Sequence, residues 1–471
     1  MRINDVIIIS FIAVTLTACI QSVCTCKALG MTHVSEDTKT IQEAIDAAKP
    51  GDTIHVSAGV YPEHLKIDKP ITLIGDNQST TILDGNGTGI LVEISSDNVS
   101  LSGFTLCNAE NAIAMINVKN CQIKGNLILN FSVFNGMGIC AYNSKNITIE
   151  ENVVRDVYYN HVYFNGTKES RITKNAFVAT SRWSQPILLI FSNQNVISWN
   201  QALGQGVLNE GGIGLLSSNH NFIMYNNIVE NDWAGISLRK SNYTIVEGNT
   251  VASQTFWGLV MKNCENNSIH WNNFIANYQH VFLNSVRNLN WSSGNYGNYW
   301  DNYDGKDSDQ DGIGDSPYVI DVENNDSHPL MGMFYCYEVY KDNERIQIIT
   351  ISNSTVNDLR YLMNANYSDG ALELNVSGIQ GTRGFCLVIF TKNLVELPYN
   401  VTVSGTPPLL LKDLSDTHSA ILYLVYIHQK PEDTIFIVSE FSSAIAVFIM
   451  PGLSQLILLI LKHRHKNQEF A

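Results

Sequence analysis

The sequence predicts an all-β chain whose main part is a parallel β-helix. Three observations support this fold class: an abundance of asparagine, a repeat of about 24 residues, and short runs in which apolar and polar residues alternate. The chain contains 51 asparagines among its 471 residues, and 36 of them lie between Asn98 and Asn298. Because asparagine disfavours helix interiors and favours turns, this density excludes a mainly helical protein.

The repeat is marked by an asparagine that lies three residues after an apolar residue. Successive spacings are 26, 23, 25, 26, 23 and 23 residues; Phe104 holds the same position before the first member, and Asn295 is expected to continue the series. Each unit contains alternating runs such as Asn146–Ile149, which are typical of strands. Such units stack as coils about 4.8 Å apart, with the asparagines forming a ladder in a turn. The members are Asn126, Asn152, Asn175, Asn200, Asn226, Asn249 and Asn272.

The segment before the repeat predicts a cap, which the open end of a solenoid requires. Apolar side chains at Ile41, Ala44, Ile45 and Ala48 predict a short amphipathic helix that ends before Pro50. Strands are then expected at 52–56 and 71–75. The β-helix is predicted to cover residues 38–332.

The pattern changes after the β-helix. Residues 336–435 lose the asparagine period and alternate polar with apolar side chains, as in Ala371–Val376. This alternation predicts a small C-terminal β-sandwich. Its expected role is that of a spacer between the β-helix and the membrane.

Both ends of the chain predict segments that meet a membrane. Residues 1–30 have the pattern of a signal peptide or N-terminal anchor, and Cys19 lies in a lipoprotein-like box, so cleavage, lipidation and a retained anchor all stay open. Residues 444–461 carry no charge and are long enough for a C-terminal transmembrane helix, although a buried apolar helix is the alternative. The basic residues of 462–471 predict a cytoplasmic tail. We therefore expect an exported, membrane-anchored cell-surface protein.

Charge and cysteine content exclude other classes. The net charge is −15, from 29 basic and 44 acidic residues, which argues against a nucleic-acid partner because such a partner needs a basic surface. The nine cysteines show neither metal-ligand spacing nor a disulfide framework. The spacing of Cys336 and Cys386 does not decide whether they are paired.

Two stretches resemble a known family. TIQEAIDAAKPGDTIHVSAGVYPEHLKIDKPITLIG looks like the opening of the pectin-lyase-like right-handed parallel β-helix superfamily. The asparagine coils and GNYWDNYDGKDSDQDGIGDSPYVI resemble the NosD-like, or CASH (carbohydrate-binding and sugar hydrolase), β-helix proteins, which are common on archaeal surfaces. The resemblance implies a right-handed helix. It leaves the function open, because the superfamily includes lyases, hydrolases, carbohydrate-binding proteins and a copper-maturation factor.

Alternate carboxylates followed by a glycine form the strongest local motif. Their spacing matches the first half of a calcium loop, in which carboxylates and a backbone carbonyl supply oxygen ligands. Tyr318 stands where a helix-flanked loop needs an acid, so the motif resembles thrombospondin-type repeats more closely. We expect a structural calcium ion, with an unliganded acidic turn as the alternative. The predicted ligands are Asp307, Asp309, Asp311, the carbonyl of Ile313, and Asp315.

Aromatic residues recur once per coil and predict a stripe along one edge of the helix. Aromatic rings can cover the apolar face of a sugar, and exposed rings are costly unless something covers them. The stripe therefore predicts a polysaccharide or glycan partner, with rings that pack on one another as the alternative. The predicted carbohydrate-binding residues are Tyr158, Tyr159, Arg182, Trp183, Trp233, Phe256, Trp257 and Tyr278.

Catalysis and copper binding are weaker hypotheses. Glu210 and Asp232 fall on adjacent coils and form the candidate pair for a polysaccharide hydrolase or lyase, but the known polygalacturonase and pectate-lyase motifs are absent. Copper is not expected, because the histidines fall in different positions of the repeat. We therefore predict glycan binding without catalysis, with a polysaccharide-cleaving enzyme and a NosD-like copper-site maturation factor as alternatives.

Overall fold

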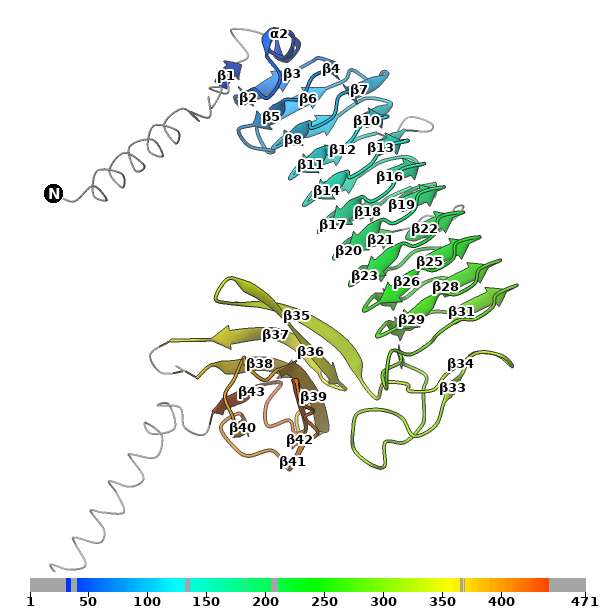
Figure 1. Ribbon diagram of the computed structural model, residues 1–471, viewed down its shortest axis with the longest axis vertical. Helices are drawn as coiled ribbons and strands as arrows, with labels where there is room; N and C mark the ends of the chain where they lie inside the picture. Colours follow the sequence, from blue (N-terminus) through cyan, green and yellow to red (C-terminus); the bar gives the residue numbers. More distant parts are fainter. Residues whose placement is uncertain are drawn as a thin grey trace, which may run out of the picture.

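A computed structural model describes residues 31–34, 40–131, 136–181, 183–204, 211–364, 367 and 369–439. Within these residues the chain folds into a long stack of coils followed by a smaller two-sheet unit (Figure 1). The stack is a parallel β-helix, as predicted, since every strand pairs in parallel with its counterpart one coil away.

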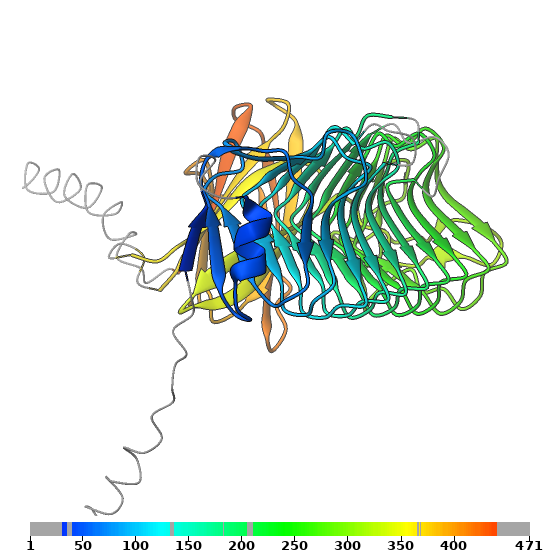
Figure 2. The same cartoon turned by 90° about the horizontal axis from the view of Figure 1, so that it is seen from above.

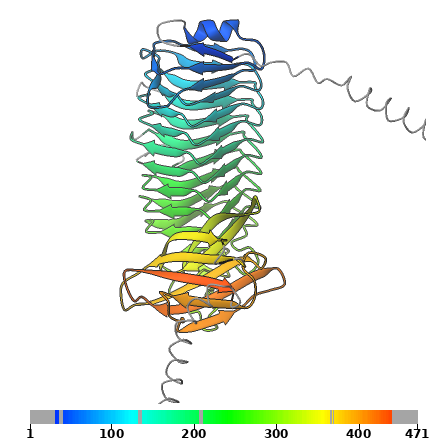
Figure 3. The ribbon, with the colours of Figure 1, turned by 90° about the vertical axis from the view of Figure 1, so that its left-hand side faces the viewer.

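Three parallel sheets run along the β-helix and are named here A, B and C (Figure 3). Sheet A contains β1 (Met31–Val34), β2 (Thr53–Val56), β5 (Thr72–Gly75), β8 (Ser100–Ser102), β11 (Gln122–Lys124), β14 (Thr148–Glu150), β17 (Arg171–Thr173), β20 (Val196–Ser198), β23 (Phe222–Met224), β26 (Ile245–Glu247) and β29 (Ser268–His270). Sheet B contains β3 (Gly59–Tyr61), β6 (Thr81–Asp84), β9 (Thr105–Cys107), β12 (Leu127–Leu129), β15 (Val153–Arg155), β18 (Ala176–Ala179), β21 (Gln201–Gly204), β24 (Asn227–Val229), β27 (Thr250–Ala252), β30 (Asn273–Ile275) and β32 (Tyr299–Trp300). Sheet C contains β4 (Leu65–Ile67), β7 (Ile90–Ile94), β10 (Asn111–Ile116), β13 (Met137–Tyr142), β16 (Asn160–Asn165), β19 (Gln185–Ile190), β22 (Ile213–Leu216), β25 (Ala234–Arg239), β28 (Trp257–Lys262) and β31 (Gln279–Asn284).

The core of the β-helix consists of apolar columns, one side chain per coil. In sheet A the central residue of each three-residue strand points inward and is almost completely buried, as Ile149, Ile172 and Ile197 are. The same side chains define the repeat in the sequence. Burial of one aliphatic side chain per strand stabilises each coil against the next.

The asparagine ladder occupies the short turn between sheets A and B. Asn200, for example, accepts bonds from the backbone N–H and Nδ2 of Asn175 at 3.0 Å, and its own Nδ2 donates to Asn226 Oδ1 at 3.0 Å. Phe104 holds the first position, as predicted, because its N–H donates to Asn126 Oδ1.

The prediction that Asn295 continues the ladder is wrong. Asn298 takes this place and accepts from the N–H of Asn272 at 3.1 Å. A small turn in which Ser293 and Tyr296 exchange backbone hydrogen bonds lies within this coil. The coil therefore reaches the ladder three residues later than the repeat predicts.

The two ends of the stack are closed differently. Helix α2 (Ile41–Ala47) lies across the N-terminal end (Figure 2), with the side chain of Thr40 capping it. At the other end the ladder stops at Asp326, whose Oδ2 accepts from the N–H of Asn298 at 2.7 Å and from Nε1 of Trp300 at 3.0 Å. Strands β33 (Tyr318–Val319) and β34 (Asn325–Asp326) belong to this cap.

The C-terminal unit contains two antiparallel sheets that share one apolar core, which agrees with the predicted sandwich. A second apolar cluster, which includes Phe334 and Leu330, joins the unit to the last coils of the β-helix. Cys336 and Cys386 are both free thiols. One sheet contains β35 (Met333–Lys341), β36 (Glu344–Ser352), β39 (Arg383–Thr391), β42 (Ser419–Ile427) and β41 (Leu410–Asp413), and the other contains β37 (Thr355–Leu362), β38 (Ala371–Ser377), β43 (Glu432–Ser439) and β40 (Tyr399–Val403).

The predicted membrane segments lie outside the described residues. This applies to the leader at 1–30, the transmembrane helix at 444–461 and the tail at 462–471. Among the residues that the structure does describe, no helix combines the length and apolar character needed to cross a membrane.

Candidate functional site

The predicted aromatic stripe lies along the edge of the β-helix where the strands of sheet C begin. Strand register fixes its order, because Asn160 pairs with Gln185, and Ala234 pairs with Trp257, which pairs with Gln279. The residue before each of these positions therefore takes an equivalent place in its coil. These residues are Tyr159, Ser184, Trp233, Phe256 and Tyr278.

The stripe becomes more exposed toward its C-terminal end. Trp233 is half-buried, Phe256 is 40% exposed and Tyr278 is 82% exposed. Trp233 packs against Phe256 with ring centroids 5.6 Å apart and meets Trp257 edge-to-face at 4.7 Å, while Trp257 Nε1 donates to Gln279 Oε1 at 3.1 Å. The rings support one another, yet two of them keep apolar surface in contact with solvent.

The other members of the predicted set are placed as follows. Tyr158 and Tyr159 are half-buried, and Trp183 is 44% exposed. Arg182 and Glu210 lie outside the described residues. The ring contacts described above therefore belong to the C-terminal end of the stripe.

Buried amides that lack partners lie beside the stripe, on the outer face of sheet C. Asn160 is completely buried, yet neither its Oδ1 nor its Nδ2 has a hydrogen-bond partner among the described residues. The Oε1 of Gln185, one coil further, and the Nε1 of Trp233 also lack partners there. Buried polar atoms are nearly always paired, and an exception indicates water or a ligand. The set offers two donors and two acceptors and carries no charge.

Sequence reasoning missed Asn160 and Gln185. Both begin a strand of sheet C, one position after the stripe, so the repeat alignment contains the signal that would have found them. Because asparagine is so frequent in this chain and favours turns, the sequence alone does not distinguish Asn160 from the turn asparagines. Only side-chain contacts separate a paired amide from an unpaired one.

A small cleft of about 190 Å³ lies at the C-terminal end of the stripe. Tyr278, Asn277, Gln279 and Asn302 contribute polar groups to its wall. His280 also lines it, and its Nε2 lies 2.9 Å from Asp301 Oδ1. Burial lowers the pKa of His280, although Asp301 acts in the opposite direction.

The proposed catalytic pair is represented in the described part of the chain by Asp232 alone. Its carboxylate is half-buried, and Oδ1 accepts from Thr255 Oγ1 at 3.2 Å. A second carboxylate at a defined distance is what a glycoside hydrolase requires. Because Glu210 lies outside the described residues, the geometry supplies no such distance.

Three of the predicted calcium ligands converge. Carboxylate oxygens of Asp307, Asp309 and Asp311 lie within 4.8 Å of one another. Burial raises the pKa of Asp307 and of Asp311, while hydrogen bonds from Ser308 lower the pKa of Asp315. Asp315 is bonded through Oδ2 to the Ser308 N–H and is not part of this trio.

The remaining predicted ligand, Ile313, is buried in the apolar cluster that joins the two units. Its N–H donates to Asp311 Oδ1 at 2.8 Å, and its side chain packs with Leu330. The loop is also tied to the C-terminal unit, since Lys412 Nζ donates to the carbonyl of Asp309. A cation in this loop would therefore order the junction between the units.

The described histidines of the β-helix do not converge on a common point that could hold copper. His161 bonds to Ser184 and His280 to Asp301, while His220 stacks on Tyr243. In the described part of the chain, the aspartate trio is the one group of three His, Cys, Asp or Glu residues whose ligand atoms converge.

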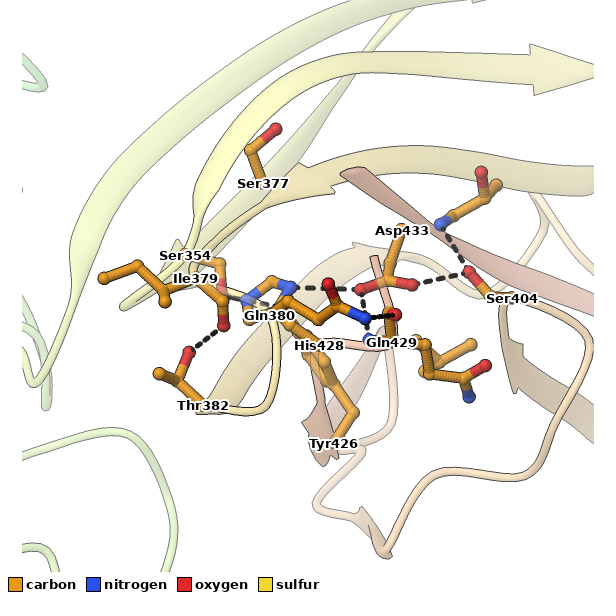
Figure 4. A network of polar contacts seen from close by, with 12 residues as sticks. Ser354, Ser377, Ile379, Gln380, Thr382, Ser404, Tyr426, His428, Gln429 and Asp433 are labelled. Carbon is orange, nitrogen blue, oxygen red and sulfur yellow. Dashed lines mark hydrogen bonds and ion pairs between the residues drawn. The ribbon is translucent and has the colours of Figure 1, made fainter. Parts of the chain in front are cut away.

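A Ser-His-Asp network in the C-terminal unit has the connectivity of a hydrolase triad (Figure 4). Ser354 Oγ lies 2.9 Å from His428 Nε2, and His428 Nδ1 lies 3.1 Å from Asp433 Oδ2. All three residues are buried, and a Cβ at Gly378 would lie 2.1 Å from His428 Nε2. Because the main chain covers the imidazole, a substrate has no room beside Ser354. Tyr426 also donates to Ser354 Oγ at 2.9 Å, so the network is structural.

Comparison with known proteins places the β-helix in a family. The family model described as "Periplasmic copper-binding protein (NosD)" matches residues 72–182 and 130–305. A probable ABC transporter binding protein NosD from Pseudomonas aeruginosa is 38% identical over 78 residues; the match spans 17% of this chain and 18% of that relative.

Solved structures with a similar fold are distant in sequence. The A-module of mannuronan C-5 epimerase AlgE6 from Azotobacter vinelandii is 14% identical over 54% of this chain and 93% of its own, with a TM-score of 0.40. An alginate lyase from Paenibacillus is 12% identical over 56% of this chain and 98% of its own, with a TM-score of 0.32. The NosD family model thus matches most of the β-helix, and the coils and asparagine ladder of this part of the chain are those of a parallel β-helix.

Proposed function

We propose that this protein binds a neutral polysaccharide along the outer edge of its β-helix, without cleaving it. The observation that carries the proposal is the presence of exposed rings at Phe256 and Tyr278 together with buried amide atoms, both of Asn160 and the Oε1 of Gln185, that lack partners among the described residues. Ligand sites typically combine apolar surface with a few placed polar groups. Hydroxyl groups both donate and accept, so they match a set of uncharged donors and acceptors.

Absence of cleavage is the second part of the proposal. Asp232 bonds to Thr255, and its proposed partner Glu210 lies outside the described residues, so the pair is left to experiment. Cleavage would be measured as a fall in polymer chain length after incubation with the full-length chain. Shortened chains would replace the binding proposal by the enzyme alternative, and Asp232→Asn would then be the variant to test for lost turnover.

Binding is tested with the ring that contributes least to stability. Tyr278→Ala removes a side chain that is 82% exposed, so folding is expected to be unchanged, while retardation by hydroxyethylcellulose or mixed-linkage glucan in affinity electrophoresis is expected to fall. Tyr340→Ala, which removes a 65% exposed ring from the C-terminal unit, is the matched control. Equal retardation of both variants and the parent chain would contradict the proposal.

The location proposed for this activity is the outside of the cell. The family whose model matches is described as periplasmic, which supports export. The apolar runs near both ends of the sequence support a leader and a C-terminal anchor. The C-terminal unit would then separate the β-helix from the membrane. Alkaline carbonate extraction of membranes would retain an anchored chain and release one that is only associated.

Copper binding is a second candidate, favoured by one contact. On the outer face of sheet C, Cys140 Sγ lies 3.5 Å from Met137 Sδ, and thiol and thioether sulfur are ligands that Cu(I) prefers. Burial raises the pKa of Cys140 to about 12, which opposes the thiolate form that binds metals. The test is a titration with Cu(I) in competition with bathocuproine, on the parent chain and on Cys140→Ser. Copper binding predicts that the parent chain takes Cu(I) from the chelator and that Cys140→Ser does not; equal behaviour of the two would contradict it.

Calcium binding by the aspartate trio is the third part of the proposal. Calcium prefers carboxylate oxygens, and three carboxylates from one short loop already face a common point. The expected role is structural, because the loop contacts the C-terminal unit through Lys412.

A further inference from the structure

A second row of outward-facing residues runs along the turn between sheets A and B, directly before the asparagine ladder. Its members have positive φ angles, a region that glycine and asparagine occupy easily and bulky residues rarely do. Three of them are nevertheless large aromatic residues: Trp199 (φ 58°), Tyr225 (φ 56°) and Trp271 (φ 61°). Strain of this kind persists only where the surrounding structure or a function requires it.

Packing against the C-terminal unit explains two of the three. Trp271 and Tyr225 lie 5.1 and 6.4 Å from the ring of Phe334 in β35. Tyr225 also donates to Glu247 Oε1 at 2.9 Å. Gly248 leaves room for the Tyr225 ring to pack toward Phe334, because a Cβ at position 248 would lie 2.4 Å from that ring.

Trp199 differs from its two neighbours in this row. Its ring stacks on Tyr225 with centroids 4.8 Å apart and an interplanar angle of 29°. It lies one coil further from the C-terminal unit, and it forms one side of a cleft of about 180 Å³. The cleft is also lined by residues 334–337 of β35 and by Asn227 and Thr250 of sheet B.

One lining residue of the cleft is hydrogen-bonded to the β-helix, and the lining is uncharged. The Asn273 side chain fixes the backbone of Phe334 by two hydrogen bonds of 2.8 Å, one from Nδ2 to the carbonyl and one from the N–H to Oδ1. The lining combines rings with amide, hydroxyl and backbone groups, and it includes no charged side chain. This composition excludes recognition by ion pairing.

We propose that this cleft binds one sugar residue of a neutral saccharide, with the ring of Trp199 as its stacking platform. The choice of ligand class rests on the proposed function, whereas the site is distinct from the aromatic stripe, because it lies at the turn between sheets A and B. Two separate sites would let the protein bind two chains or two parts of one chain, which increases avidity without new contacts at either site.

The test counts binding sites on the full-length chain by isothermal titration with cellotetraose, xylotetraose, mannotetraose and chitotetraose. Trp199→Gly removes the ring at a φ that favours glycine, so folding is expected to survive. Lys174→Gly makes the same change at the equivalent exposed position one coil earlier, outside the cleft, and is the matched control. Asn160→Leu removes the amide beside the stripe.

The proposal predicts two equivalents of one tetrasaccharide on the parent chain and on Lys174→Gly, but one on Trp199→Gly and one on Asn160→Leu. One equivalent that only Trp199→Gly abolishes would support the cleft and contradict the proposed site on sheet C. Undiminished stoichiometry in Trp199→Gly, or no binding of any probe to the parent chain, would overturn the inference. If Trp199→Gly fails to fold, Asn227→Ala, at an exposed residue of the same cleft, gives the same readout.

Discussion

Buried asparagines in this β-helix fall into two groups that differ in their hydrogen bonding. Ladder residues such as Asn200 use Oδ1 and Nδ2 fully, and each fixes the backbone of the neighbouring coils. Asn160 is equally buried but has no partner among the described residues for either side-chain atom. The first group stabilises the fold, whereas the second reduces its stability in the absence of a ligand.

Asn200→Ala tests the contribution of the ladder. The substitution leaves the buried N–H of Asn175 without its partner and removes the Nδ2 bonds to the Ile172 carbonyl and to Asn226, so we expect the free energy of unfolding to fall by about 3 kcal/mol. Urea titration measures the change. Asn263→Gly, on an exposed outer turn with φ 54°, is the control and should change stability by less than about 0.5 kcal/mol. Similar losses in the two variants would be inconsistent with a special role for the ladder.

The buried imidazole of His161 is expected to make the folded state less stable in acid. Burial lowers its pKa to about 3, whereas the unfolded chain takes up the proton near pH 6.5. Stability is therefore complete above pH 6.5 and falls as the pH drops toward 3, by up to about 1.4 kcal/mol per pH unit. His161→Gln removes this titration. Between pH 7.5 and 4.5 the parent chain should lose about 2–3 kcal/mol more unfolding free energy than the variant; equal losses would show that the group does not titrate this way.

At the scale of single elements, the repeat predicts much of the fold. The apolar columns and the ladder follow directly from residue identity at fixed spacing, and the N-terminal helix follows from its own period. The position of Asn298 was missed because a turn within one coil changes the spacing without changing the composition. The repeat also places the residues of the stripe at equivalent positions in successive coils, because strand register fixes both the strands and the residues that precede them.

The aspartate loop brings three of the five predicted calcium ligands close together. The trio of Asp307, Asp309 and Asp311 converges, whereas Asp315 bonds to Ser308 instead. Spacing alone cannot predict this difference, because a carboxylate can satisfy a nearby backbone N–H or face a cation. The loop geometry decides which.

Removal of calcium tests whether the loop binds the ion. With EDTA we expect the melting temperature of the parent chain to fall, because bound calcium stabilises the folded state by mass action. Asp309→Asn should lower the melting temperature in calcium and make EDTA nearly ineffective. Asp304→Asn changes an exposed carboxylate outside the trio and should behave like the parent chain. An EDTA effect of equal size in Asp309→Asn would place the ion elsewhere.

At the scale of the whole molecule, a long β-helix carries the outer face of sheet C on one side and the C-terminal unit at one end (Figures 1 and 3). A shared apolar cluster, which includes Phe334 and Ile313, connects the two units. Hydrogen bonds between Asn273 and the backbone of Phe334 add to this connection. The fold positions rings and amides at regular intervals along one edge. A regular array of this kind suits a polymeric ligand better than a single small molecule.

The most direct test of glycan binding on sheet C compares two buried asparagines. Asn160→Leu replaces an unpaired amide, whereas Asn195→Leu replaces one whose Nδ2 and Oδ1 are both bonded. The account predicts that Asn160→Leu raises the free energy of unfolding by about 1–2 kcal/mol and abolishes retardation by a neutral glucan at the sheet C site, while Asn195→Leu lowers stability. An Asn160→Leu chain that is less stable than the parent and binds the glucan as well would contradict the account.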